Sequence, residues 1–172
     1  MLTVVYLVHE EQEEHNMSIR DAVKYCRKPL SHGCDREVFY SKKYNIIVKK
    51  QRSDSLDDDA MEQFANEKRI FEEMDSNENE IFPVIDIFDY KGRNVLLMKV
   101  CKPLSSYEVF RNKNFDCVET IDEAIEVSKK LGLDMSYVLR YADFIRKYEL
   151  QDLHYGNVGV YENHLVIIDG GY

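Results

Sequence analysis

Cysteine is scarce in this chain of 172 residues, and its four cysteines are scattered singly. Cys26, Cys34, Cys101 and Cys117 form no CxxC pair, and none has a His-rich neighbour at the spacing of zinc ligands. This pattern disfavours a zinc site and is typical of reduced thiols in a cytosol. We therefore expect a cytoplasmic protein.

Positive charge is also in short supply. Lys and Arg total 23 against 32 for Asp and Glu, which gives a formal net charge of -9 at pH 7. A protein with this balance repels phosphate backbones and anionic lipid unless it carries a local basic patch. Nucleic acid is therefore not expected to be its main partner.

Long hydrophobic runs are missing as well. The N-terminal segment MLTVVYLVH (1–9) is too short to span a bilayer, and it lacks a basic leader and a small-residue cleavage site. It continues directly into the acidic sequence EEQEEH. We expect a strand or a tucked-in segment here rather than a signal peptide, and no association with a membrane.

The first half of the chain is predicted to be rich in antiparallel strands. The β-rich runs at 37–41 and 44–50 are joined by a polar KK step, and those at 81–90 and 93–100 are joined by Lys91 and Gly92. Each pair indicates a hairpin. The composition, 44% hydrophobic and 12% aromatic, suits one folded domain or two small lobes that share a core.

Helices are expected before and between these hairpins. Residues 18–28 can form a short helix that Pro29 ends. The acidic, serine-containing stretch at 53–60 leads into the periodic segment 60–74, and negative charge suits a helix N-terminus. We therefore interpret it as the approach to a helix rather than as a disordered acidic run.

The second half of the chain is predicted to be mainly helical. A turn or two at 107–111 is followed by a helix at 119–131, which Gly132 closes, and by another at 135–148. The apolar face expected for this last helix consists of Met135, Val138, Leu139, Ala142 and Ile145. A strand-like run at 164–169 ends the pattern, so the fold class is α+β.

Two charged residues in the first half stand in apolar surroundings. Alternation along the strand places Lys49 on the same face as Ile47, although a strand end at which the lysines reach water is the alternative. Glu67 is the single charge in the helical stripe Ala60, Phe64, Glu67, Phe71 and Met74. A carboxylate in such a stripe needs a cation unless it is solvated at the edge, and Lys49 is the obvious candidate.

The last segment of the sequence gathers oxygen-bearing side chains. Asp152 and Asn157 lie five residues apart in a loop that contains glycine, and Asp169 follows the apolar run HLVII. A tight turn at 161–164 allows Asp169 to return beside the other two. These three side chains suit Mg²⁺, which water and phosphate usually complete, while a polar turn with a capped aspartate is the plainer alternative.

These five positions, in this order, resemble the protein kinase-like superfamily. Its pattern is a strand lysine paired with a helix glutamate, a D-x-x-x-x-N loop, and a metal-binding aspartate after a strand. The matching segments are IIVK with Lys49, ANEKRIF with Glu67, DLHYGN with Asp152 and Asn157, and IIDGG with Asp169. The resemblance covers roughly residues 30–172. It implies a minimal two-lobed kinase-like fold, with an antiparallel β-rich N-terminal lobe (1–99) and a truncated helical C-terminal lobe (100–172).

The resemblance also implies the roles of these residues. Lys49 would hold the α- and β-phosphates of ATP, and Glu67 would orient it. Asp152 would accept or orient the proton of the attacking hydroxyl, while Asn157 and Asp169 would bind Mg²⁺. Positioning and electrostatics would then supply most of the catalysis.

Adenine is expected at a hinge formed by Lys99, Val100 and Cys101, with Met98 guarding the back pocket. The phosphate-covering loop departs from the glycine-rich pattern, because SHGCDREVFY contains only Gly33. The grip on phosphate then falls to Ser31 and to backbone N–H groups.

Other departures concern the second half. Leu150 and Gln151 replace the usual His-Arg, and Gly170 replaces the Phe of D-F-G, so no arginine is present there to anchor a phosphorylated activation loop. The sequence stops soon after the metal aspartate, as do the early protein kinases of T7-like phages, which REVFYS…NIIVKK and DLHYGN also resemble. DLHYGN is similar, too, to the D-L-H-x-G-N loop of aminoglycoside and choline kinases, which leaves the acceptor open.

We therefore expect an ATP- and Mg²⁺-dependent serine/threonine protein kinase of phage type that acts on host proteins in a bacterial cytoplasm. The alternative is a kinase-shaped module that binds and inhibits a host protein without transferring phosphate. A small-molecule phosphotransferase is less expected, because it would need helices after the metal aspartate to build an acceptor pocket. A second copy of the chain could cover the surface that such helices hide, so a homodimer stays open.

Overall fold

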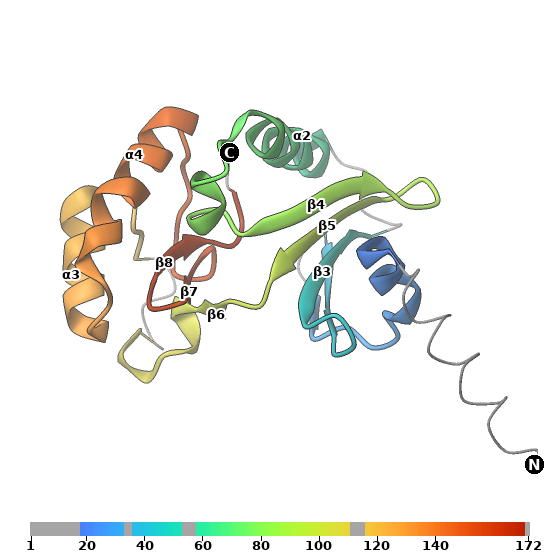
Figure 1. Ribbon diagram of the computed structural model, residues 1–172, viewed down its shortest axis with the longest axis horizontal. Coiled ribbons are helices and arrows are strands. Elements are labelled where there is room, and N and C mark those ends of the chain that lie inside the picture. Colours follow the sequence, from blue (N-terminus) through green and yellow to red (C-terminus); the bar gives the residue numbers. More distant parts are fainter. Residues whose placement is uncertain (1–17, 33–35, 53–57, 111–115, 171–172) are drawn as a thin grey trace, which may run out of the picture.

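The computed structural model describes residues 18–32, 36–52, 58–110 and 116–170. Figure 1 shows two groups of elements: a twisted sheet with α2 beside it, and the α3–α4 pair with the hairpin of β7 and β8. The N-terminal segment expected as a strand or a tucked-in segment lies outside the described residues. The predicted mixture of helices and antiparallel strands is confirmed.

The first group is built on a five-stranded antiparallel sheet in the order β1-β2-β3-β5-β4. Its strands are β1 (Ser31–His32), β2 (Arg36–Ser41), β3 (Ile46–Gln51), β4 (Val84–Asp89) and β5 (Asn94–Lys99). Both predicted hairpins are confirmed. Their turns contain left-handed residues, with φ of 51° at Asn45, 56° at Lys91 and 74° at Gly92.

Helical segments pack on both faces of this sheet. One face carries a hydrophobic cluster that includes residues of the 3₁₀ helix η1 (Ile19–Tyr25): Ala22, Val23, Phe39, Ile46, Val48, Val95 and Leu97. The alternate residues Leu96 and Met98 belong instead to a larger core that contains Ile70 of α2 (Asp58–Glu73). Because neighbouring strand residues point to opposite faces, η1 and α2 lie on opposite sides of the sheet.

The second group contains a smaller sheet and two helices. The strands β6 (Lys102–Pro103), β7 (Val158–Tyr161) and β8 (His164–Ile167) form a three-stranded antiparallel sheet. The helices are α3 (Ile121–Leu131) and α4 (Val138–Tyr148). Short 3₁₀ segments complete the order: η2 (Glu78–Glu80), η3 (Leu104–Ser106), η4 (Glu108–Phe110) and η5 (Met135–Tyr137).

Helix α3 ends as the sequence predicts, and it begins at Ile121, two residues after the predicted start. Thr120 and Glu123 form a reciprocal capping box at its N-terminus. Gly132 ends the helix in the left-handed conformation, with φ of 66°, and its N–H bonds to the carbonyl of Lys129 at 3.3 Å. Both ends of α3 are therefore defined by local sequence.

The buried face of α4 differs from the prediction. Val138 and Ile145 are buried as expected, but Leu139 is 63% exposed. Met135, in the preceding turn, is 40% exposed. The buried residues of α4 are Val138, Tyr141, Phe144, Ile145 and Tyr148. The predicted face was wrong because it left out the aromatic side chains, which remove the largest apolar areas from water.

One hydrophobic core joins the two groups. It extends from Ile70 and Leu96 beside the large sheet to Phe144 of α4 and Ile167 of β8. A backbone hydrogen bond of 2.8 Å from Ile167 N–H to the carbonyl of Ile81 also crosses between them. Among the residues that the structure describes, no helix has the length and hydrophobicity to cross a membrane.

Candidate functional site

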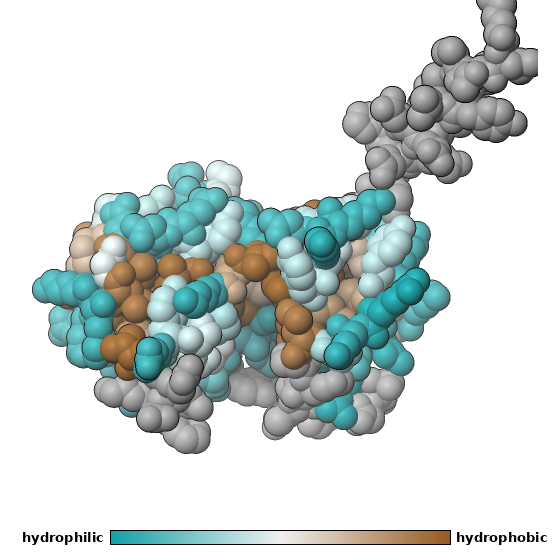
Figure 2. Space-filling view, turned by 90° about the horizontal axis from the view of Figure 1, so that it is seen from below, coloured by the Kyte–Doolittle hydropathy of each residue, from teal (hydrophilic) through white to brown (hydrophobic). Residues whose placement is uncertain are grey.

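A cavity of about 430 Å³ lies where the large sheet meets β6 and the segments that flank the β7–β8 hairpin. Its apolar walls come from both groups of elements: Leu30, Val38, Ile47, Met98, Pro103 and Ile168. Figure 2 shows hydrophobic surface gathered in the middle of the lower face of the molecule, where the surface is hollowed. A cavity of this size with apolar walls and a few polar groups is typical of a small-ligand site.

The charged end of the cavity is formed by Arg36, Lys49 and Asp169. Lys49 comes from β3 and is almost buried, with 8% of its side chain exposed. Its Nζ lies 3.2 Å from Asp169 Oδ1 and also donates a hydrogen bond to the carbonyl of Ile168. Lys49 and Ile47 both line the cavity, so the predicted alternation is confirmed and the alternative in which Lys49 reaches water is wrong.

Glu67 is completely buried, so the alternative in which it is solvated is wrong. Its partner is Arg36 rather than Lys49: the distances from Arg36 Nη1 to Glu67 Oε1 and from Nη2 to Oε2 are 2.9 and 2.7 Å. Within the described residues, Lys49 forms no ion pair with Glu67. The guanidinium group places two nitrogens beside the two carboxylate oxygens, with a hydrogen bond from Nη1 to Oε1 and a close ion pair between Nη2 and Oε2.

Two residues of this network were not predicted. Arg36 is one, and it begins β2 two residues before Val38, which faces Lys49 across the hairpin. Strand alternation therefore places Arg36 and Val38 on the cavity face, and this signal was available in the sequence. The other is Gln63, one helical turn before Glu67, whose Nε2 donates to Asp169 Oδ1 at 3.0 Å.

Asp152, Asn157 and Asp169 lie in one hydrogen-bonded unit. The Asn157 side-chain amide donates to the backbone carbonyl of Asp152 at 2.9 Å. The backbone carbonyl of Asn157 accepts hydrogen bonds from the backbone N–H groups of Ile168 and Asp169, at 2.9 and 3.1 Å. The structure thus joins the D-x-x-x-x-N loop to the backbone of Ile168 and Asp169.

The loop that carries Asp152 is held on several sides. Asp152 itself is exposed, with a left-handed φ of 55°. The next residue, Leu153, is fully buried, and its N–H donates to Glu119 at 3.2 Å. A Cβ atom at Gly156 would come within 2.7 Å of the His154 ring, so the ring would have to move if this residue carried a side chain. Asp152 is therefore presented to solvent from an anchored backbone.

Only some of the residues predicted to contact adenine and phosphate line the cavity. Met98 is buried at the back of the cavity, and Lys99 and Cys101 line it. Burial raises the pKa of the Cys101 thiol to about 12, so this thiol is not a nucleophile at neutral pH. Val100 is 40% exposed and is not among the described residues that line the cavity. The backbone of Ser31 pairs with Val38 in the sheet, while Gly33 lies outside the described residues.

The electrostatics of the two carboxyl groups differ. Burial alone would raise the pKa of Asp169, but the nearby Lys49 and Arg36 lower it to about 2. Burial raises the pKa of Glu67, and the Arg36 guanidinium opposes that rise. Asp169 is therefore ionised at neutral pH.

We expect Asp169→Asn to destabilise the protein in a pH-dependent way. A folded pKa below the unfolded value stabilises the folded state above the unfolded pKa, and this contribution is lost as the pH falls through the folded pKa. The difference in unfolding free energy between wild type and variant should be about 2 kcal/mol at pH 6, from a shift of nearly two pKa units, and should shrink towards zero at pH 2. Urea unfolding at several pH values measures it, and a difference that does not change with pH would contradict this assignment.

The oxygen groups suit a hard cation only when further ligands join them. In the part of the chain that the structure describes, no group of three or more His, Cys, Asp or Glu side chains is placed to hold a metal. Asn157 uses its amide nitrogen on Asp152, so its Oδ1 is directed away from that carbonyl. Asn157 Oδ1 and the Asp169 carboxylate are ligands of the kind that Mg²⁺ takes together with waters and phosphate oxygens.

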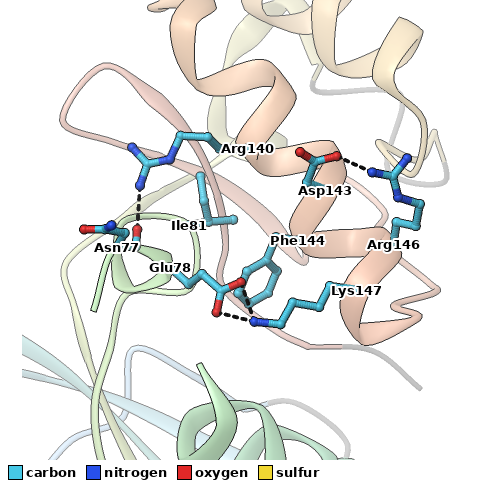
Figure 3. Close-up of a pocket in the computed structure, with 8 residues that line it drawn as sticks. All are labelled: Asn77, Glu78, Ile81, Arg140, Asp143, Phe144, Arg146 and Lys147. Carbon is cyan, nitrogen blue, oxygen red and sulfur yellow. Dashed lines mark hydrogen bonds and ion pairs between the residues drawn. The ribbon is translucent and has the colours of Figure 1, made fainter. Parts of the chain in front are cut away.

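A second cavity, of about 400 Å³, lies between η2 and α4. Figure 3 shows that its charged side chains bind one another: Lys147 donates to Glu78 at 2.8 Å, Arg146 to Asp143 at 2.5 Å, and Arg140 to the Asn77 carbonyl at 2.6 Å. Burial opposes ionisation of Glu78, but the bond from Lys147 helps to lower its pKa. The bonds from Lys147 and Arg140 therefore join the η2 segment to α4.

The first cavity can bind a flat apolar ring between Val38, Met98 and Ile168 and an anionic tail at Lys49 and Arg36. Asp152 is exposed and is not among the described residues that line this cavity. No protein-family model matches this chain, and no curated protein is significantly similar to it in sequence.

Proposed function

We propose that the chain is an ATP- and Mg²⁺-dependent serine/threonine protein kinase of phage type, which phosphorylates host proteins in a bacterial cytoplasm. The observation that carries this proposal is the cavity itself. It joins an apolar slot to the Lys49–Asp169 ion pair of 3.2 Å, and the Asp152–Asn157 loop is hydrogen-bonded to the same aspartate. The two groups of elements then correspond to the two lobes of a minimal kinase-like fold.

Each residue has a role in this proposal. Lys49 binds the α- and β-phosphates and positions them, while Asn157 and Asp169 would hold Mg²⁺, which would offset negative charge on the phosphates. Asp152 accepts a hydrogen bond from the attacking serine or threonine hydroxyl and takes its proton. Met98 and Cys101 bound the adenine slot. These contributions are positioning and electrostatic stabilisation, which supply most of the catalysis in phosphoryl transfer.

The proposal is tested by incubation with labelled ATP, Mg²⁺ and host lysate. We expect wild type to label proteins, and Asp152→Asn to reduce the initial rate by at least about a hundred-fold, because a positioned base contributes roughly that much or more. Asp143→Asn is the matched control, since Asp143 is exposed on α4 and bonds to Arg146. Equal labelling by wild type and Asp152→Asn would remove the proposal.

One observation favours a second candidate, a kinase-shaped module that binds and inhibits a host protein. Arg36, rather than Lys49, holds the helix glutamate, so the lysine–glutamate pair of an active kinase is not formed in this structure. The two candidates are separated by Lys49→Ala and Asp169→Ala. A biological effect that survives both substitutions would show that phosphate transfer is dispensable.

A further inference from the structure

We propose that Arg36 is a second phosphate-binding cation of this site, which works beside Lys49 in place of a glycine-rich loop. The inference rests on the proposed function in one respect, because it takes the charged end of the cavity as the place of the nucleotide's phosphates. The inference goes beyond the proposed function in two ways. It gives Arg36 of β2 a role in binding the triphosphate, and it gives Glu67 the role of positioning that arginine.

Arg36 lies in the cavity beside Lys49. Its side chain is only 11% exposed, yet it lines the same cavity as Lys49. Arg36 Nη1 lies 3.4 Å from Asp169 Oδ1, and Lys49 Nζ lies 3.2 Å from the same oxygen. Two cations therefore converge on one point, at the end of the cavity where the oxygen ligands lie.

The contacts of Arg36 differ in strength. Arg36 Nη1 donates a hydrogen bond of 2.9 Å to Glu67 Oε1, and Nη2 lies 2.7 Å from Oε2 as a close ion pair, whereas the contact of Arg36 with Asp169 is the longest of the network. A phosphate group could replace the Asp169 contact while Glu67 continues to hold the guanidinium. Glu67 is then a positioning residue, because it is fully buried and fixes the direction of the arginine fork.

Charge and local sequence support the same role. The two cations and the two carboxylates of the network sum to zero, so an entering polyphosphate needs a cation released from a carboxylate. A cation bound to Asp169 would take over its charge and release Arg36 towards phosphate. The segment before β2 contains only one glycine, Gly33, so its backbone is less suited to wrap phosphate than a glycine-rich loop. Guanidinium groups match phosphate oxygens in a planar, bidentate geometry.

The test compares Glu67→Gln with the double variant Arg36→Gln/Glu67→Gln. This pair removes the arginine without leaving a buried carboxylate alone, so both proteins are expected to fold, which thermal unfolding checks. Calorimetry with Mg²⁺ then measures the binding of ATP, inorganic tripolyphosphate and adenosine. We expect removal of Arg36 to weaken ATP and tripolyphosphate by roughly 10- to 100-fold, and adenosine by less than about two-fold. Arg36→Lys/Glu67→Gln should restore part of the loss.

The outcomes separate this inference from the proposed function. Equal affinities of wild type and both variants for ATP and tripolyphosphate would overturn the role of Arg36, even if the protein is a kinase. Tripolyphosphate binding that depends on Arg36, without any binding of adenosine or ATP, would support the inference and remove the kinase proposal. Failure of wild type to bind either phosphate compound would overturn both.

Discussion

Arg36→Gln alone is expected to lower the free energy of unfolding by about 3 kcal/mol. The substitution leaves Glu67 fully buried without its ion-pair partner, and breaking one side of a buried ion pair strands an uncompensated charge. The double variant Arg36→Gln/Glu67→Gln should recover most of the loss, because neither charge is left inside. Urea unfolding of wild type, both single variants and the double variant measures this double-mutant cycle.

Arg140→Gln is the matched control for this cycle. Arg140 lies 2.6 Å from Glu80, but both side chains are at least 40% exposed, so the loss should stay below about 1 kcal/mol. A loss of less than about 1 kcal/mol for Arg36→Gln would contradict the assignment. It would show that Lys49 moves onto Glu67, which is the pairing expected from sequence.

The local features of the fold could be predicted because their causes lie within a few residues. The turn at Lys91 and Gly92, the end of α3 at Gly132 and the shared face of Ile47 and Lys49 follow from backbone freedom and from strand alternation. The burial of Glu67 against a cation could also be predicted, since a carboxylate in an apolar stripe requires one.

The identity of that cation could not be predicted in the same way. Arg36 and Lys49 both point to the cavity from paired strands, and Glu67 is 31 residues from Arg36 in the chain. Which of the two cations reaches the Glu67 carboxylate depends on side-chain length and on how closely α2 approaches the sheet. Neither the hydrophobic periodicity nor the secondary-structure propensity of the sequence specifies these distances. The burial of Tyr141 and Phe144, rather than Leu139, likewise depends on what packs against α4.

Lys49→Met is expected to reduce phosphate transfer by on the order of a thousand-fold while the protein stays folded. The Lys49 ammonium group contacts the Asp169 carboxylate and donates to the carbonyl of Ile168, which follows β8. Its loss would therefore remove both a positive charge and a positioning contact from the proposed phosphate site. Methionine fills a similar volume without a charge, and Asp169 keeps its contacts with Arg36 and Gln63. Initial rates with labelled ATP and thermal unfolding measure the two effects separately.

Lys50→Met is the control that makes this result specific. Lys50 is the next residue of β3, and strand alternation directs it to the face opposite that of Lys49. It should leave the rate within about two-fold of wild type, because its charge lies outside the cavity. Equal losses in the two variants would mean that general positive charge on β3, rather than an ammonium group in the cavity, supports transfer. A Lys49→Met protein that is folded and retains its rate would contradict the role of Lys49 in phosphate transfer, because Arg36 would then be the cation of the cavity that supports the reaction.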